Sequence, residues 1–223
     1  MISKLCGAAC VAAFGLCAAS GASAKVMVAT YDGVVSSMSG GAFHTDGVAG
    51  SAFKLSFKYD TDLGESVDFP LSQVGVFGGT GDAPGTVSPV LLASVEINGV
   101  RQIFQAEFDG SAFLEFGDEN DIFHSASTCA SPGFFCASLL ANFHPTSMPA
   151  DLTSRLDVDG SGDGEIDILD SDFRHTSATL ALQHLTIAEA IPEPAIWVSL
   201  IGGLFGAGSM LRQQRGRRTP AAA

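Results

Sequence analysis

The stretch that decides the fold is "FKLSFKYDTD", residues 53–62, in which apolar and polar side chains alternate one by one. The apolar side chains belong to Phe53, Leu55, Phe57 and Tyr59. Successive side chains of a β-strand point to opposite faces, so a period of two residues predicts a half-buried strand. One face of this strand should therefore pack into a core.

The segment "VLLASVEINGVRQIFQAEF", residues 90–108, predicts a β-hairpin around Asn98-Gly99, because this dipeptide favours the two-residue type I′ turn. Alternating apolar segments at residues 25–38, 111–116, 137–143 and 177–187 predict further strands. Glycine, aspartate and serine separate these strands, and no long segment has a helical period. The pattern predicts a mostly β fold, an antiparallel β-sandwich or jelly roll. We interpret the many phenylalanines as core residues; a sugar-stacking platform is the alternative.

The N-terminal 24 residues have the pattern of a Sec-type signal peptide. Lys4 precedes an uncharged stretch, and Ala22-Ser23-Ala24 is a small-x-small cleavage signature. We therefore expect a signal helix over residues 1–24 that is removed during export, with the mature chain beginning at Lys25. Three cysteines, Cys6, Cys10 and Cys17, would leave with it.

Near the C-terminus, residues 195–211 carry no charge and lie between Glu193 and Arg212. As a helix this run would be about 26 Å long, slightly short of a bilayer core of ~30 Å. It predicts a single transmembrane helix, and a buried core helix is the alternative. The basic cluster that follows should remain cytoplasmic, so that the preceding chain lies outside. This cluster consists of Arg212, Arg215, Arg217 and Arg218.

Residues 191–223 combine Pro192-Glu193-Pro194, Trp197, a glycine-rich apolar run and the arginine cluster. This order closely resembles the PEP-CTERM sorting tail of Gram-negative bacteria. The resemblance implies recognition by an exosortase in the inner membrane, cleavage near Pro-Glu-Pro, and release or attachment at the cell surface. Proteins with such tails are typical of bacteria that produce exopolysaccharide and biofilm matrix.

The part between the two signals, residues 25–190, is strongly acidic and long enough for one domain with a real core. It contains six basic and 23 acidic residues, a net charge near −17. Such a charge repels nucleic acid and anionic lipid and favours cations or neutral polymers as partners. We therefore expect no nucleic-acid partner.

Two cysteines, Cys129 and Cys136 in "CASPGFFC", remain after removal of the signal peptide. Export favours oxidation, and a pair at this spacing can close a short loop. We therefore expect a disulfide; a metal or redox pair is the alternative.

The segment "DGSGDGEIDILD", residues 159–170, resembles a twelve-residue calcium loop of EF-hand or dockerin type. A Ca²⁺ ion requires six to eight oxygen ligands, and Gly164 stands where such a loop turns sharply. The last position is aspartate, as in dockerins, and the flanks do not predict long helices. An acidic β-turn is the alternative. The candidate ligands are Asp159, Ser161, Asp163, Glu165, Asp167 and Asp170.

The sequence contains no nucleophile elbow, no HExxH zinc motif and no phosphate-binding loop, so we expect no enzyme. The histidines are scattered, at His44, His124, His144, His175 and His184. The leading hypothesis is an exported surface or matrix protein whose β domain binds or organises exopolysaccharide. A purely structural surface protein and a secreted hydrolase with an unrecognised site are the alternatives.

Overall fold

A computed structural model describes most of the central part of the chain. The described residues are 26–43, 49–69, 72–81, 85–105, 109–116, 120–130, 135–169 and 174–190. The predicted signal peptide and the predicted transmembrane helix lie outside them. Among the described residues, no helix combines the length and the apolar character needed to span a membrane.

The regular elements of the described part are eleven β-strands. They are β1 (Val26–Ser39), β2 (Ala52–Asp60), β3 (Glu65–Phe69), β4 (Gln73–Gly78), β5 (Val90–Ile97), β6 (Val100–Phe104), β7 (Asp109–Glu115), β8 (Asp121–Ala130), β9 (Phe135–Pro145), β10 (Leu156–Leu169) and β11 (His175–Glu189).

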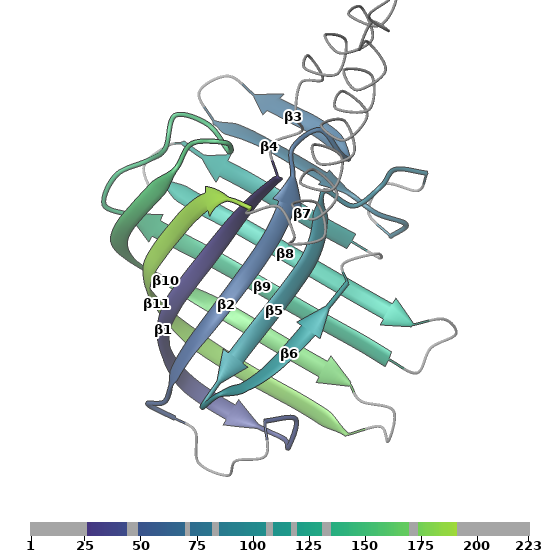
Figure 1. Cartoon of the computed structure of the whole chain (residues 1–223), viewed down its shortest axis with the longest axis vertical. Helices are drawn as coiled ribbons and strands as arrows, with labels where there is room; N and C mark the ends of the chain where they lie inside the picture. Colours follow the sequence, from purple (N-terminus) through teal and green to yellow (C-terminus); the bar gives the residue numbers. More distant parts are fainter. Residues whose placement is uncertain are drawn as a thin grey trace, which may run out of the picture. The chain divides into compact units, whose positions relative to one another are not determined.

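All eleven strands belong to one antiparallel sheet in the order β3-β4-β7-β8-β9-β10-β11-β1-β2-β5-β6. The sheet curls over itself, so that β2 and β5 lie across β8 (Figure 1). The side of the sheet enclosed by this curl is called the inner face, and the opposite side the outer face. The mostly β, antiparallel prediction is confirmed, but the strands form one continuous sheet where two stacked sheets were expected.

The curl occurs around the three longest strands, β10, β11 and β1. Their pairing shifts between Asp32 and Gly33, between Val35 and Ser37, and between Asp159 and Gly162. Such bulges bend a strand and increase its twist. The bent strands can therefore pass from one layer of the curled sheet to the other without breaking the hydrogen-bonded ladder.

The alternating stretch from Phe53 to Tyr59 lies in β2, with its apolar side chains buried as expected. The predicted hairpin is β5–β6, in which Ile97 pairs with Val100 across the turn. Asn98 and Gly99 have φ angles of 51° and 79°, the left-handed values that a type I′ turn requires. Strands β3, β4, β8 and β10 were not predicted.

The core fills the inner face and contains an aromatic group with three polar members. Tyr31, Phe57, Tyr59 and Phe143 are fully buried around His124. The imidazole of His124 stacks on Phe57 with ring centroids 5.6 Å apart and lies 5.0 Å from the ring of Tyr59. These five residues, called the inner cluster, join strands β1, β2, β8 and β9.

Hydrogen bonds satisfy most polar atoms of the inner cluster. The Tyr31 hydroxyl bonds to Nδ1 of His124 at 2.6 Å, and the Tyr59 hydroxyl donates to the carbonyl of Leu152 at 2.7 Å. Within the described residues, Nε2 of His124 has no partner. Burial lowers the pKa of His124 from 6.5 to about 3, because a charged imidazole would lose its hydration without gaining a counter-ion.

Candidate functional site

The outer face of β4, β7 and β8 carries a row of three aromatic rings. Phe77, Phe113 and Phe123 come from strands that are neighbours in the sheet. The ring centroids lie 6.4 Å apart for Phe77–Phe113 and 6.3 Å for Phe113–Phe123. All three side chains are partly exposed. We call these residues the aromatic row.

Strand register places the aromatic row on the outer face. Phe113 lies directly opposite Phe123, and Phe77 opposite Ser111, which shares a face with Phe113. Gly75 on β4 makes room for the central ring, since a Cβ atom there would lie 1.9 Å from Cδ1 of Phe113. A glycine is therefore required at this position for the ring to lie flat across the strand.

On the next two strands, polar side chains lie on the outer face in line with the aromatic row. Asn142 on β9 lies opposite Phe123, and Asp163 on β10 lies opposite Asn142. The amide both donates and accepts hydrogen bonds, and the carboxylate accepts them. The outer face thus combines apolar ring surface with adjacent hydrogen-bonding groups.

The twelve residues predicted to form a calcium loop belong mostly to strand β10, and this part of the prediction is wrong. Gly164 pairs with Ala141 and Leu180 inside the ladder, so the chain is extended where the sharp turn was expected. The physical reason is a period of two, in which buried Val158, Ile166 and Ile168 alternate with exposed acidic residues. A strand satisfies this pattern by burying one face.

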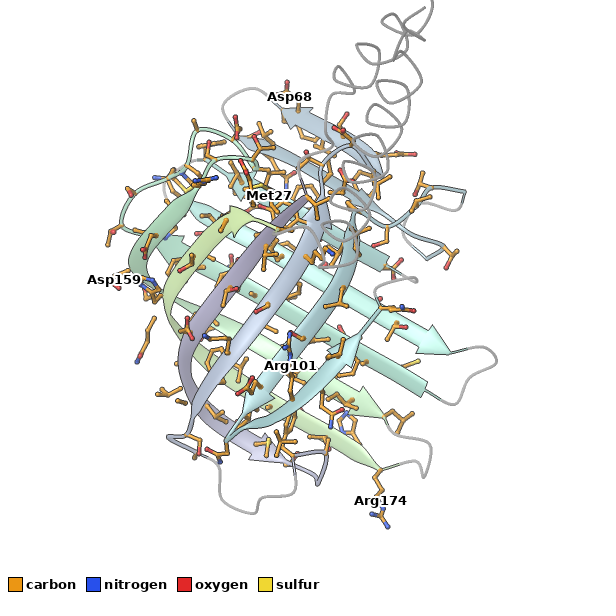
Figure 2. The ribbon with its side chains drawn as sticks, in the orientation of Figure 1. Met27, Asp68, Arg101, Asp159 and Arg174 are labelled. Carbon is orange, nitrogen blue, oxygen red and sulfur yellow. The ribbon has the colours of Figure 1, made fainter. Side chains whose placement is uncertain are left out.

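The candidate calcium ligands therefore form a ridge along the exposed side of β10. These residues are Asp159, Ser161, Asp163, Glu165 and Asp167, and Asp159 points away from the sheet in Figure 2. Alternate residues of a strand lie about 6.8 Å apart. The ridge therefore spreads its oxygen atoms along the strand, whereas a calcium loop brings them together around one ion. The sixth candidate, Asp170, lies outside the described residues. Calcium binding stays a prediction.

Histidines pair with two carboxylates of this ridge. His184 on β11 bonds through Nδ1 to Asp159 at 2.8 Å and through Nε2 to Asp157 at 2.9 Å. The hydrogen bond to Asp159, reinforced by the charges of both carboxylates, raises the pKa of His184 above its ordinary value. Nε2 of His175 lies 3.2 Å from Asp167. Even so, the described residues contain no group of three or more His, Cys, Asp or Glu residues arranged to hold a metal ion.

The predicted disulfide partners stand opposite each other where β8 and β9 meet. Cys129 pairs in register with Cys136, and Cys136 is disulfide-bonded. Directly opposed residues of antiparallel strands have Cα atoms about 4.5 to 5.5 Å apart, a separation that a disulfide can bridge. The register thus suits the expected bond, and the Cys129–Cys136 pairing itself stays a prediction.

A hollow of about 290 Å³ lies beside Cys136 and is also lined by Ser127, Ser138, Asp167 and His175. Serine, histidine and aspartate are the residue types of a hydrolase triad, so the hollow is where the hydrolase alternative would apply. A triad requires the serine hydroxyl to bond to the imidazole. In the described part of the chain, His175 pairs with Asp167 and no serine hydroxyl bonds to it. The hydrolase alternative stays a prediction.

The remaining predicted residues are placed as follows. His144 on β9 pairs with the nearly buried Asp121 on β8. His44 lies outside the described residues, as do all residues of the sorting tail. These tail residues are Pro192, Glu193, Pro194, Trp197, Arg212, Arg215, Arg217 and Arg218.

The aromatic row was missed because the phenylalanines were assigned to the core as one group. Their positions carried a signal: Phe113 alternates in phase with Ser111 and Glu115, and Phe123 with Asp121 and Ser125. An aromatic residue in the polar phase of a strand belongs to the outer face.

Known proteins add no further assignment, since the chain matches no protein-family model and is similar to neither a curated protein nor a solved structure.

Proposed function

We propose that this protein is an exported surface or matrix component whose β domain binds a neutral polysaccharide through the aromatic row. The observation that carries the proposal is the row itself: three partly exposed rings on adjacent strands, with polar side chains at their side. Its role is binding and structural organisation, and no catalytic step is involved.

The chemistry of a sugar chain suits this surface. A pyranose ring has apolar C–H faces and hydroxyl groups around its edge, so it stacks on aromatic rings and hydrogen-bonds to flanking polar groups. Phe113 and Phe123 offer the stacking surface, and Asn142 offers a donor and an acceptor beside them. Several weak contacts along one polymer then add up to useful affinity.

Charge selects the class of polymer. Asp163 and Glu165 lie on the same outer face, one strand beyond Asn142 and Leu140. Together with a net charge near −17 for residues 25–190, they repel polymers rich in uronic acid or sulfate. A neutral polysaccharide meets no such barrier.

The tail supplies the address in this proposal. The signal-peptide pattern of residues 1–24 supports passage through the Sec route. The resemblance of residues 191–223 to a PEP-CTERM segment supports transient anchoring in the inner membrane and processing by an exosortase. The mature protein would then lie at the cell surface or in the extracellular matrix. Mass spectrometry of the mature C-terminus after cell fractionation tests this step. Loss of Trp197 and the arginine cluster is expected, and their retention at the cell surface would count against processing.

Affinity electrophoresis tests the binding step. The exported chain migrates through native gels that contain a neutral glucan, a uronic-acid polymer or no polymer. The proposal predicts retardation by the neutral glucan only, and reduced retardation for Phe113→Ala. Leu91→Ala is the control, because Leu91 is an exposed apolar residue of β5 outside the row. Equal migration in every gel would support the purely structural alternative, and shortening of the glucan would support a hydrolase.

A further inference from the structure

The sheet has two open edges, formed by β3 and β6. Each of these strands is hydrogen-bonded on one side only within the described residues, because they stand first and last in the strand order. The outward N–H and C=O groups of such a strand can pair with another strand. Native proteins usually protect these edges with short strands, charged side chains, proline, a bulge or a covering segment.

The backbone of β6 is oriented for such pairing. In a two-residue hairpin the pair next to the turn, here Ile97–Val100, is hydrogen-bonded, and bonded and non-bonded pairs then alternate. Arg101 and Ile103 belong to the non-bonded pairs, so their N–H and C=O groups point away from β5. On the inner side, the side-chain amide of Gln102 donates to the carbonyl of Ala42. In the described part of the chain, no strand lies beyond β6 on its outward side.

Both edges expose apolar side chains. Phe69 on β3 is 60% exposed and Ile103 on β6 is 58% exposed. Only two other large hydrophobic residues of the described chain, Val87 and Leu91, are exposed. Neither edge strand contains a lysine or a proline, and the pairing of neither strand with its neighbour shows a bulge.

The two edges carry opposite charges. Exposed Glu65 and Asp68 make strand β3 acidic, and exposed Arg101, which lies opposite Glu96 of β5, is the one charged residue of strand β6. Figure 2 shows Asp68 and Arg101 on different parts of the sheet. Each edge would repel a second copy of itself and attract the other edge.

We propose that copies of this chain associate head to tail, with β6 of one copy beside β3 of the next. Ten antiparallel steps separate the two strands, so β3 and β6 run in the same direction. A neighbour that continues the sheet with its outer face on the same side therefore pairs them in parallel. The register that matches charge and apolar surface sets Glu65 beside Arg101 and Val67 beside Ile103.

This association is heterologous, and each added copy exposes a new β3 or β6 edge. Contacts of this type grow into open chains unless the rotation between copies closes a ring. An extended assembly suits a matrix component. The inference does not depend on the proposed polysaccharide binding, because the edges are separate from the aromatic row.

Charge reversal tests the association without disturbing the core. Sedimentation velocity over a range of concentrations compares the exported chain, the variant Arg101→Glu and the double variant Glu65→Lys/Asp68→Lys, with no polysaccharide present. Lys58→Glu is the matched control, because it makes the same charge change as Arg101→Glu on the non-edge strand β2. Circular dichroism checks that all variants remain folded.

The proposal predicts that the unaltered chain and Lys58→Glu self-associate, and that each edge variant alone does so about tenfold more weakly. An equimolar mixture of the two edge variants should associate, because an acidic β6 edge then meets a basic β3 edge. Raising the salt concentration should weaken association of the unaltered chain. A monomeric unaltered chain, or edge variants that associate as strongly as the unaltered chain, would overturn the proposal. A mixture that stays monomeric would also overturn it.

Discussion

Phe123 and His124 are neighbours on β8, yet they serve opposite sides of the sheet. His124 lies in the inner cluster, fully buried against Tyr31, Phe57 and Tyr59. Phe123 lies in the aromatic row, partly exposed beside Phe113. Strand β8 thus contributes His124 to the stabilising core and Phe123 to the candidate binding surface.

The difference lies in what surrounds each ring. The inner cluster excludes water, so its polar atoms must find partners inside the protein, and the pKa of His124 falls to about 3. The aromatic row keeps one side in water, so its apolar surface remains available to a ligand. Changes to the inner cluster should therefore alter stability, and changes to the row should alter binding.

Removal of the buried imidazole should have the largest effect. His124→Ala leaves a cavity among aromatic rings and deprives the Tyr31 hydroxyl of its partner. We expect the free energy of unfolding to fall by about 3 kcal/mol, measured by urea denaturation. Phe123→Ala, one residue away, should lower it by only about 1 kcal/mol. Equal losses would break the distinction between the two faces.

Loss of the expected disulfide at the C-terminal end of β8 should have the next largest effect. A disulfide between Cys129 and Cys136 would close a short loop and contribute roughly 2.5 kcal/mol by chain entropy. We expect Cys136→Ser to lower the free energy of unfolding by about this amount. Thiol labelling of the native exported chain should find no reactive cysteine, and two reactive thiols would contradict the expected bond.

Acid should destabilise the inner cluster. Burial lowers the pKa of His124 to about 3, so below pH 6.5 the unfolded chain binds a proton that the folded chain does not. Stability is therefore fully present above pH 6.5 and is lost as the pH falls toward 3. At pH 5 the loss from this group should be about 2 kcal/mol.

Urea midpoints at pH 7.5, 6.5, 5.5 and 4.5 measure this loss, and His124→Phe provides the control. Phenylalanine cannot titrate, so the slope of stability against pH should be smaller in this variant. Identical slopes would show that His124 does not account for the acid sensitivity.

Partly exposed His184 on β11 should respond in the opposite sense and with the smallest effect. The hydrogen bond to Asp159 helps raise the pKa of His184. The contribution of His184 to the free energy of unfolding is therefore present below the ordinary pKa of histidine and is lost as the pH rises through the raised pKa. Because the pair is exposed, we expect at most about 0.5 kcal/mol. An NMR titration should show the His184 pKa falling in Asp159→Asn; no change would contradict the role of this bond.

Much of the fold could be predicted from the sequence because strand alternation is a local signal. The alternation from Phe53 to Tyr59 predicted β2, and Asn98-Gly99 predicted the β5–β6 turn. The single curled sheet could not be predicted in this way. It depends on the pairing of β11 with β1, which joins residues far apart in the sequence. It also depends on the bulge beside Asp159, which bends strand β10.

The candidate site shows how one composition fits two structures. The Asp-Gly repeats from Asp159 satisfy the spacing of a calcium loop, but Ile166 and Ile168 also satisfy a strand, and burial of these two residues favours the strand. The pairing of His184 with Asp157 and Asp159 required the register of two strands. The aromatic row was accessible from sequence, through the phase of Phe113 within its strand.

The most direct test of the account measures polysaccharide retardation and the free energy of unfolding on the same preparation of Phe113→Ala/Phe123→Ala. Both residues are partly exposed on the outer face. We expect retardation by the neutral glucan to be lost while the free energy of unfolding falls by no more than about 2 kcal/mol. Unchanged retardation, with the double variant still folded, would contradict the claim that the aromatic row is the binding surface.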